Sequence, residues 1–110
     1  MNSYNKYTDL QINELVATRL KKKCLLTEES VLAYMDSGYR TFDPCNNPTD
    51  AMPIIIENLI SLMADMSDDG GSTWWCASDI SNGITSRYKS NPLRAAMEVF
   101  LMIKDAENEG

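Results

Sequence analysis

Two Asn-Pro pairs, at positions 47–48 and 91–92, each stand directly before a long apolar segment. Asparagine is a preferred N-cap, and proline suits the first helical position because its N–H would be unpaired there and its φ is already helical. The stretches NPTDA and NPLRA therefore predict the first residues of two helices. Any fold of this chain must fix both helix starts in ordered loops and bury the apolar residues that follow.

The two predicted helices differ in their apolar pattern. The first is expected over about residues 48–58, where Asp50 complements the positive end of the helix dipole and Pro53 predicts a kink or a restart. The second is expected over about residues 92–106 and is apolar on almost every side. Such a helix lies at the centre of a fold or at an oligomer interface.

A third helix is predicted near the N-terminus, over about residues 8–20. Thr8 and Gln11 have the spacing of a capping box, which marks a helix start. Its apolar stripe is then Ile12, Leu15, Val16 and Leu20, and the residues expected outside that stripe are Asn13, Glu14, Thr18 and Arg19.

Short strand-like segments separated by turn residues occupy the rest of the chain. CLL and VLAYM flank TEES, ISLMAD and TWWCAS flank SDDGGS, and the alternating ITSRYK follows SNG. Hairpin connections of this kind favour antiparallel pairing over βαβ units. We therefore expect one α+β domain over residues 1–110, with a small antiparallel sheet of four to five short strands and helices packed on one face.

Charge and cysteine content restrict the partners and the compartment. The net charge of −6 removes the general attraction to phosphate backbones, so nucleic acid is not an expected partner. Three separated cysteines without a C-x-x-C pair indicate a reducing, cytosolic compartment. No segment is apolar enough to predict a membrane span or a signal peptide.

Enzyme chemistry is disfavoured because the chain has no histidine. Cys45 is the best candidate nucleophile, but without a paired base it reads as a small buried apolar residue. The residues Asp65, Ser67, Asp69 and Gly70 match the first half of an EF-hand loop, yet Cys76 stands where the final glutamate belongs. We therefore expect no catalytic residue, no metal and no cofactor.

Arg94 and two adjacent tryptophans are the residues that most invite a functional interpretation. Arg94 falls at the third helical position, where the dipole disfavours a cation, so it should either pair with Asp43 or Asp50 or bind an anion. Trp74 and Trp75 should point to opposite faces of a strand, one into the core and the other toward a helix, a ligand or a partner.

The stretches FDPCNNPTDAMPIIIEN and NPLRAAMEVFLM resemble the signature blocks of the NinX family, small accessory proteins of lambda-like bacteriophages. Trp74 to Ala77 resembles the family less closely. The family usually has tryptophan where this chain has Met52, which removes a stacking group. The resemblance implies a phage origin and the host cytoplasm, but it does not by itself imply any particular activity.

Two function classes remain. In the first, the protein is a non-catalytic binder that sequesters a small anionic or nucleotide-like ligand, which would suit a role against host defence. The residues expected at that site are Asp43, Asn46, Asn47, Asp50, Trp74, Trp75, Asn91 and Arg94. In the second, it is an interaction module that binds and inhibits a host protein. We also expect a homodimer, because the last helix has more apolar surface than one small sheet can cover.

Overall fold

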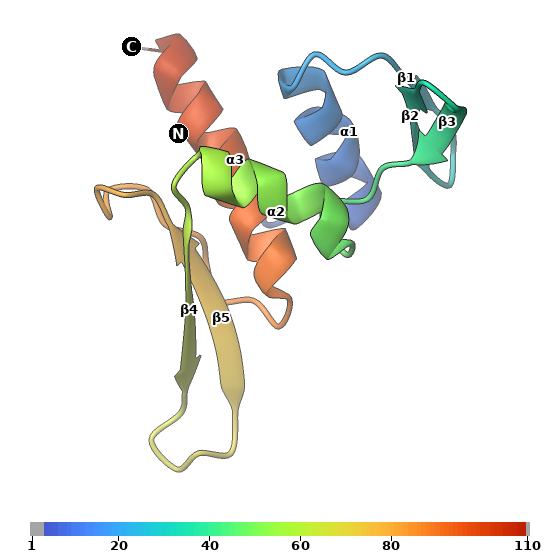
Figure 1. Cartoon of the computed structure of the whole chain (residues 1–110). Helices are drawn as coiled ribbons and strands as arrows, with labels where there is room; N and C mark the ends of the chain where they lie inside the picture. The colour runs from blue at the N-terminus through green and yellow to red at the C-terminus, as the bar shows by residue number, and fades with distance from the viewer. Residues whose placement is uncertain (1–3, 110) are drawn as a thin grey trace.

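Within residues 4–109, which the computed structural model describes, the chain forms three helices and five short strands. Figure 1 shows them in order: α1 (Asp9–Arg19), β1 (Cys24–Leu26), β2 (Val31–Met35), β3 (Gly38–Thr41), α2 (Pro48–Glu57), β4 (Ser61–Met66), β5 (Thr73–Ser78) and α3 (Pro92–Glu109). The predicted α+β class is confirmed. All three helices begin within one residue of the predicted starts.

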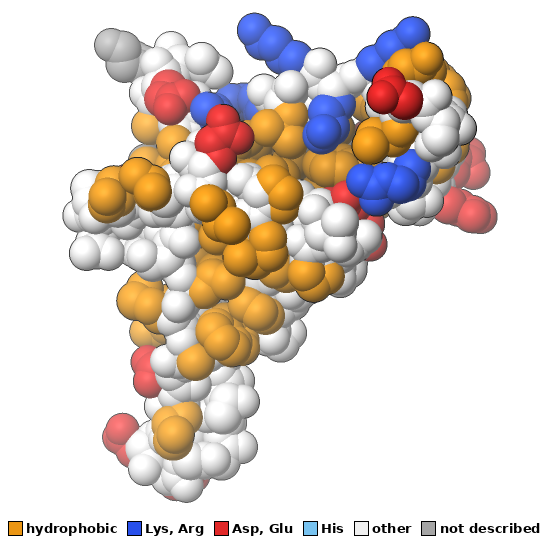
Figure 2. Space-filling model, viewed as in Figure 1, with side chains coloured by type: hydrophobic (Ala, Val, Ile, Leu, Met, Phe, Trp, Pro, Cys, Tyr) orange, Lys and Arg blue, Asp and Glu red, His pale blue; other side chains and the backbone are white. Residues whose placement is uncertain are grey.

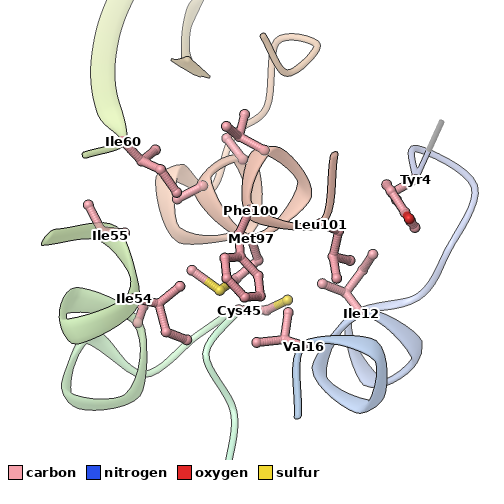
Figure 3. Packing of buried hydrophobic residues seen from close by; sticks show 14 of the residues in the cluster. Tyr4, Ile12, Val16, Cys45, Ile54, Ile55, Ile60, Met97, Phe100 and Leu101 are labelled. Carbon is pink, nitrogen blue, oxygen red and sulfur yellow. The ribbon is translucent and has the colours of Figure 1, made fainter. Parts of the chain in front are cut away.

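The last helix, α3, lies at the centre of the fold and contacts α1, α2, β4 and β5. Every residue from 95 to 102 is buried. Figure 3 shows Met97, Phe100 and Leu101 of α3 between Ile54 of α2 and Ile12 of α1. The expectation of a central helix is confirmed, and the apolar surface of α3 is covered within the chain. An oligomer therefore does not have to be built on α3.

The strands divide into two sheets rather than the single sheet expected. One has the order β1-β2-β3, the other is the hairpin β4-β5, and all pairs are antiparallel. The sequence stretch that separates β3 from β4 contains α2, so β3 and β4 cannot be joined by a tight hairpin turn. β3 itself was not predicted; the chain reverses into it at Gly38, whose φ of 117° is accessible mainly to glycine.

Two local expectations are corrected. Asn13 was placed outside the buried stripe of α1, but its side chain is buried because it bonds to the loop that precedes α2. ITSRYK was read as a strand, but it forms only isolated bridges at Thr85 and Lys89. In contrast, α2 continues through Pro53 without a restart, because Ala51 and Ile54 on either side are held in the core.

The hairpin β4-β5 projects away from the helices (Figure 1). Only its inner end reaches the core, through the paired residues Leu62 and Ala77. Its far end is a turn in which the Asp69 carboxylate accepts hydrogen bonds from the Ser67 hydroxyl (2.6 Å) and the Gly71 N–H (2.8 Å). These bonds lower the pKa of Asp69 below its ordinary value. The Asp-rich segment is therefore a hydrogen-bonded turn.

Candidate functional site

The loop between β3 and α2 ends in the predicted helix start. The Asn47 side chain accepts a hydrogen bond from the Thr49 N–H (3.0 Å), so Asn47 is the N-cap of α2. Before it, Phe42, Pro44 and Cys45 are buried. This local order explains the density of prolines and capping residues in the sequence, because the loop must hold a fixed shape over the core.

Asn13 holds this loop from the side of α1. Its amide N–H donates to the Asp43 carboxylate (2.8 Å), and its side-chain oxygen accepts from the Cys45 N–H (3.1 Å). Asn46 donates to Asp43 as well (3.2 Å) and to Asp9 (3.3 Å). Asp43 and Asn46 therefore lie together, as expected, but their polar groups are largely satisfied by protein partners.

Asn91 links the same loop to α3. Its side-chain oxygen accepts from the Leu93 N–H (2.9 Å), which makes it the N-cap of α3. Its amide N–H donates to the Cys45 carbonyl (2.6 Å) and to the Asn46 side chain (3.2 Å). One asparagine thus fixes both a helix start and the position of a loop 46 residues earlier in the chain.

Arg94 is oriented inward, and only 11% of its side chain is exposed. Its guanidinium donates to Asp9 (2.7 Å) and Glu98 (2.8 Å), and also to the backbone carbonyls of Tyr4 (2.9 Å) and Tyr7 (2.6 Å). Burial alone would lower the pKa of Arg94, but the hydrogen bonds that it donates to Asp9 and Glu98 outweigh burial and raise that pKa. The expected partners, Asp43 and Asp50, are not the ones Arg94 uses.

Asp50 pairs with a different arginine. Its carboxylate accepts from Arg40 (3.2 Å) and from the Asp43 N–H (2.9 Å). The Asp50 side chain is 2% exposed, whereas Arg40 is 48% exposed. Asp50 therefore serves as a buried anchor that holds the Arg40 guanidinium at the surface.

Two pockets flank this network, and their charges differ. The first, of about 210 Å³, is lined by the predicted residues Asp43 and Asn46 together with Asp9 and Glu29, and no Lys or Arg lines it. Three carboxylates around one small pocket repel an anion. The site predicted around Asp43 and Asn46 thus has the wrong sign for the anionic ligand expected there.

The second pocket, of about 260 Å³, lies between α2 and the β1-β2-β3 sheet. Lys22, Arg40 and Asp50 line it, and Ala33, Phe42 and Ile54 are among its apolar residues. The Lys22 ammonium lies 5.2 Å from the centre of the Phe42 ring. Figure 2 shows blue side chains gathered over the upper part of this face. The lysine run at 21–23 is the sequence signal for this pocket. It was missed because that region was interpreted only as the start of a strand.

Trp74 and Trp75 lie apart from both pockets, on β5. Both are half-buried, so the expectation that one of them fills the core is wrong. The reason is that the hairpin projects beyond the helices at this point (Figure 1). The ring of Trp74 packs against Tyr88 at a centroid distance of 5.1 Å, and its Nε1 is buried without a hydrogen-bond partner among the described residues.

Cys45 and the acidic residues were the remaining candidates for a nucleophile or a metal site. Burial, reinforced by the nearby Asp9 carboxylate, raises the pKa of the Cys45 thiol far above its ordinary value, so the thiol stays protonated. Within residues 4–109, no group of three or more Asp, Glu, Cys or His side chains could hold a metal ion. None of the described helices has the length and apolar character that a bilayer span requires.

Comparison with protein families gives a match over most of the chain. Residues 3–104 match the family model described as "Bacteriophage P22, NinX", which covers nearly the whole chain of 110 residues. The match includes both Asn-Pro helix starts and the loop that precedes α2, and it confirms the family expected from those two blocks. No curated protein matches the chain.

Proposed function

The chain belongs to the NinX family of bacteriophage proteins, and on that premise we propose that it is a non-catalytic accessory protein that binds a small anionic, nucleotide-like ligand in the host cytoplasm. The observation that carries this proposal is the pocket between α2 and the β1-β2-β3 sheet, which Lys22 and Arg40 line together with apolar side chains. Sequestration of a host defence signal is the role that such binding would serve in a phage.

Lys22 and Arg40 keep N–H hydrogen-bond donors available for a ligand. The charge-assisted hydrogen bond to Asp50 is the one polar contact of the Arg40 guanidinium among the described residues, and nearly half of the Arg40 side chain is exposed. Lys22 forms no ion pair within residues 4–109. Arginine and lysine side chains in this state bind phosphate or carboxylate oxygens. In a chain of net charge −6, the run of Lys21, Lys22 and Lys23 is a local exception, and Lys22 shares the pocket with Arg40.

The α2 side of the pocket restricts the ligand further. Glu57 and Thr49 of α2 line it together with the cations, so a ligand with hydrogen-bond donors at its uncharged end fits better than a simple anion. Nucleobases carry such donors. The volume of about 260 Å³ lies just below the usual range for small-molecule sites, which favours a ligand no larger than a mononucleotide.

Thermal unfolding with a panel of mononucleotides, cyclic nucleotides and inorganic phosphate tests this proposal. A ligand present at 100 times its Kd should stabilise the protein by about 2.7 kcal/mol, which is a shift of several degrees in Tm. Lys22→Gln should reduce that shift, whereas Lys6→Gln, which makes the same charge change at an exposed position away from the pocket, should not. Equal shifts in the two variants would contradict binding at this pocket.

A second candidate, an interaction module that binds and inhibits a host protein, is favoured by a separate observation. Figure 2 shows hydrophobic side chains over α2 and down the hairpin. The large apolar residues exposed along α2 and β4 are Met52, Ile56, Leu59, Met63 and Met66. Exposed apolar surface of this kind marks contact sites. Enrichment of one host protein by the wild type, and its loss on Ile56→Asp, would support this candidate.

A further inference from the structure

The outer edge of β4 has no strand beside it among the described residues. Trp75 exchanges both of its backbone hydrogen bonds with Lys89 (2.7 Å each), on the side of β5 away from β4. Trp75 and its β4 partner Ala64 therefore form a non-hydrogen-bonded pair, and the N–H and C=O of Ala64 point away from β5, toward the outer edge of β4. The same holds for Leu62, because its partner Ala77 bonds through its carbonyl to Ser86.

Natural sheets protect such edges with lysine, proline, bulges or very short strands. β4 has six residues, SLMADM, with no lysine or proline. Asp65 closes one position by accepting a hydrogen bond from the Met66 N–H (2.8 Å), which leaves Leu62 and Ala64 open. An isolated two-stranded sheet that projects from its protein is also marginally stable in water and gains from further strands.

We propose that β4 pairs with β4 of a second copy of this chain, antiparallel about a two-fold axis at Met63, so that two hairpins form one four-stranded sheet. In this register Leu62 of one copy exchanges N–H···O bonds with Ala64 of the other. Met63 then lies opposite Met63, with Cα atoms about 4.5 Å apart. The surface is self-complementary, as a two-fold interface must be.

The charges of the hairpin favour this antiparallel pairing over a parallel one. Asp65, Asp68 and Asp69 lie at or near the tip, and residues 66–72 contain no Lys or Arg. Antiparallel pairing places the two acidic tips at opposite ends of the joint sheet, whereas parallel pairing would bring them together. Across the seam, Asp65 then faces Ser61, which can donate to it, and no carboxylate faces another.

Exposed residues next to β4 fit the same arrangement. Met66 of one copy comes beside the Leu59–Ile60 end of the other. Leu59 has a positive φ of 55°, which is unfavourable for leucine, and its side chain is 59% exposed. This φ belongs to the end of α2, where the Ile60 N–H bonds to the Ile55 carbonyl and the Leu59 N–H to the Ile56 carbonyl. The exposed side chain of Leu59 has no such role, and the second copy would cover it.

Complementary charge variants at residue 63 test the two-fold axis. Met63 is 42% exposed, so Met63→Asp and Met63→Lys leave the core unchanged. Light scattering over a range of concentrations should give the wild type a mass approaching twice 12.4 kDa. Each variant alone should be monomeric, with Kd raised roughly tenfold or more, because like charges then face each other across the axis. An equal mixture of the two should recover the dimer.

Met52→Asp is the matched control, since Met52 is exposed to a similar degree (39%) but lies on α2. It should dimerise like the wild type. Circular dichroism should show the same fold for all variants, and if one charge variant unfolds, the other still reports on the interface. A wild type that stays at 12.4 kDa overturns the proposal, as do single variants that dimerise or a mixture that remains monomeric.

Discussion

At the residue scale, Arg94 shows how a side chain that looks functional can be structural. Its position at the start of α3 is unfavourable for a cation, and the compensation comes from Asp9, Glu98 and two carbonyls of the N-terminal segment. These contacts tie residues 4–9 to α3. The charge therefore fixes the N-terminal segment rather than a ligand.

Replacing Arg94 by methionine should destabilise the protein by about 3–5 kcal/mol, because Glu98 is buried and loses one of its two cations. Because Lys89 still pairs with Glu98 at 3.1 Å, the loss of stability should lie toward the lower end of this range. Arg87→Met, at an exposed position, should have almost no effect. Urea unfolding measures the stability of both variants. Adding Glu98→Gln to Arg94→Met should restore part of the lost stability, because the buried charge is then removed. A stable Arg94→Met protein would mean that the buried pair contributes little.

At the element scale, the sequence predicted what neighbouring residues determine. Caps, prolines and apolar spacing lie within a few residues of each helix start, so the three helices and the two main hairpins could be found. The division into two sheets could not, because it depends on where α2 lies relative to strands far along the chain. The partners of Arg94 and Asp43 could not be predicted for the same reason: Asp9 and Asn13 reach them from α1, and no local signal links these residues.

The two N-caps should not be equivalent in stability, although the sequence gives both the same role. Asn47→Ala removes one capping bond and should cost about 0.5–2 kcal/mol. Asn91→Ala also removes the donor to the Cys45 carbonyl, which adds about 1–3 kcal/mol for an unsatisfied buried acceptor. Denaturant unfolding of the two variants under identical conditions gives the difference. Equal losses would show that the link from α3 to the loop is not a source of stability.

At the scale of the whole molecule, the charge distribution is uneven. The chain carries −6 overall, yet the pocket beside α2 is bordered by Lys22 and Arg40, and the hairpin tip is acidic. Ligand binding at the pocket would join opposite charges. Pairing of two hairpins would join two chains of the same sign. These two associations must therefore respond to salt in opposite directions.

Raising the salt concentration from 0.1 M to 1 M shortens the Debye length from about 10 Å to about 3 Å. The repulsion between two chains of charge −6 is then screened, so the Kd of the dimer should fall. Sedimentation at several salt concentrations measures this Kd.

The attraction between an anionic ligand and the cations Lys22 and Arg40 is screened as well, so the Kd of the ligand should rise. Titration calorimetry on the monomeric Met63→Asp variant measures that Kd without interference from dimerisation. A dimer that weakens with salt would mean that ion pairs, rather than the apolar and backbone contacts of β4, hold the two copies together.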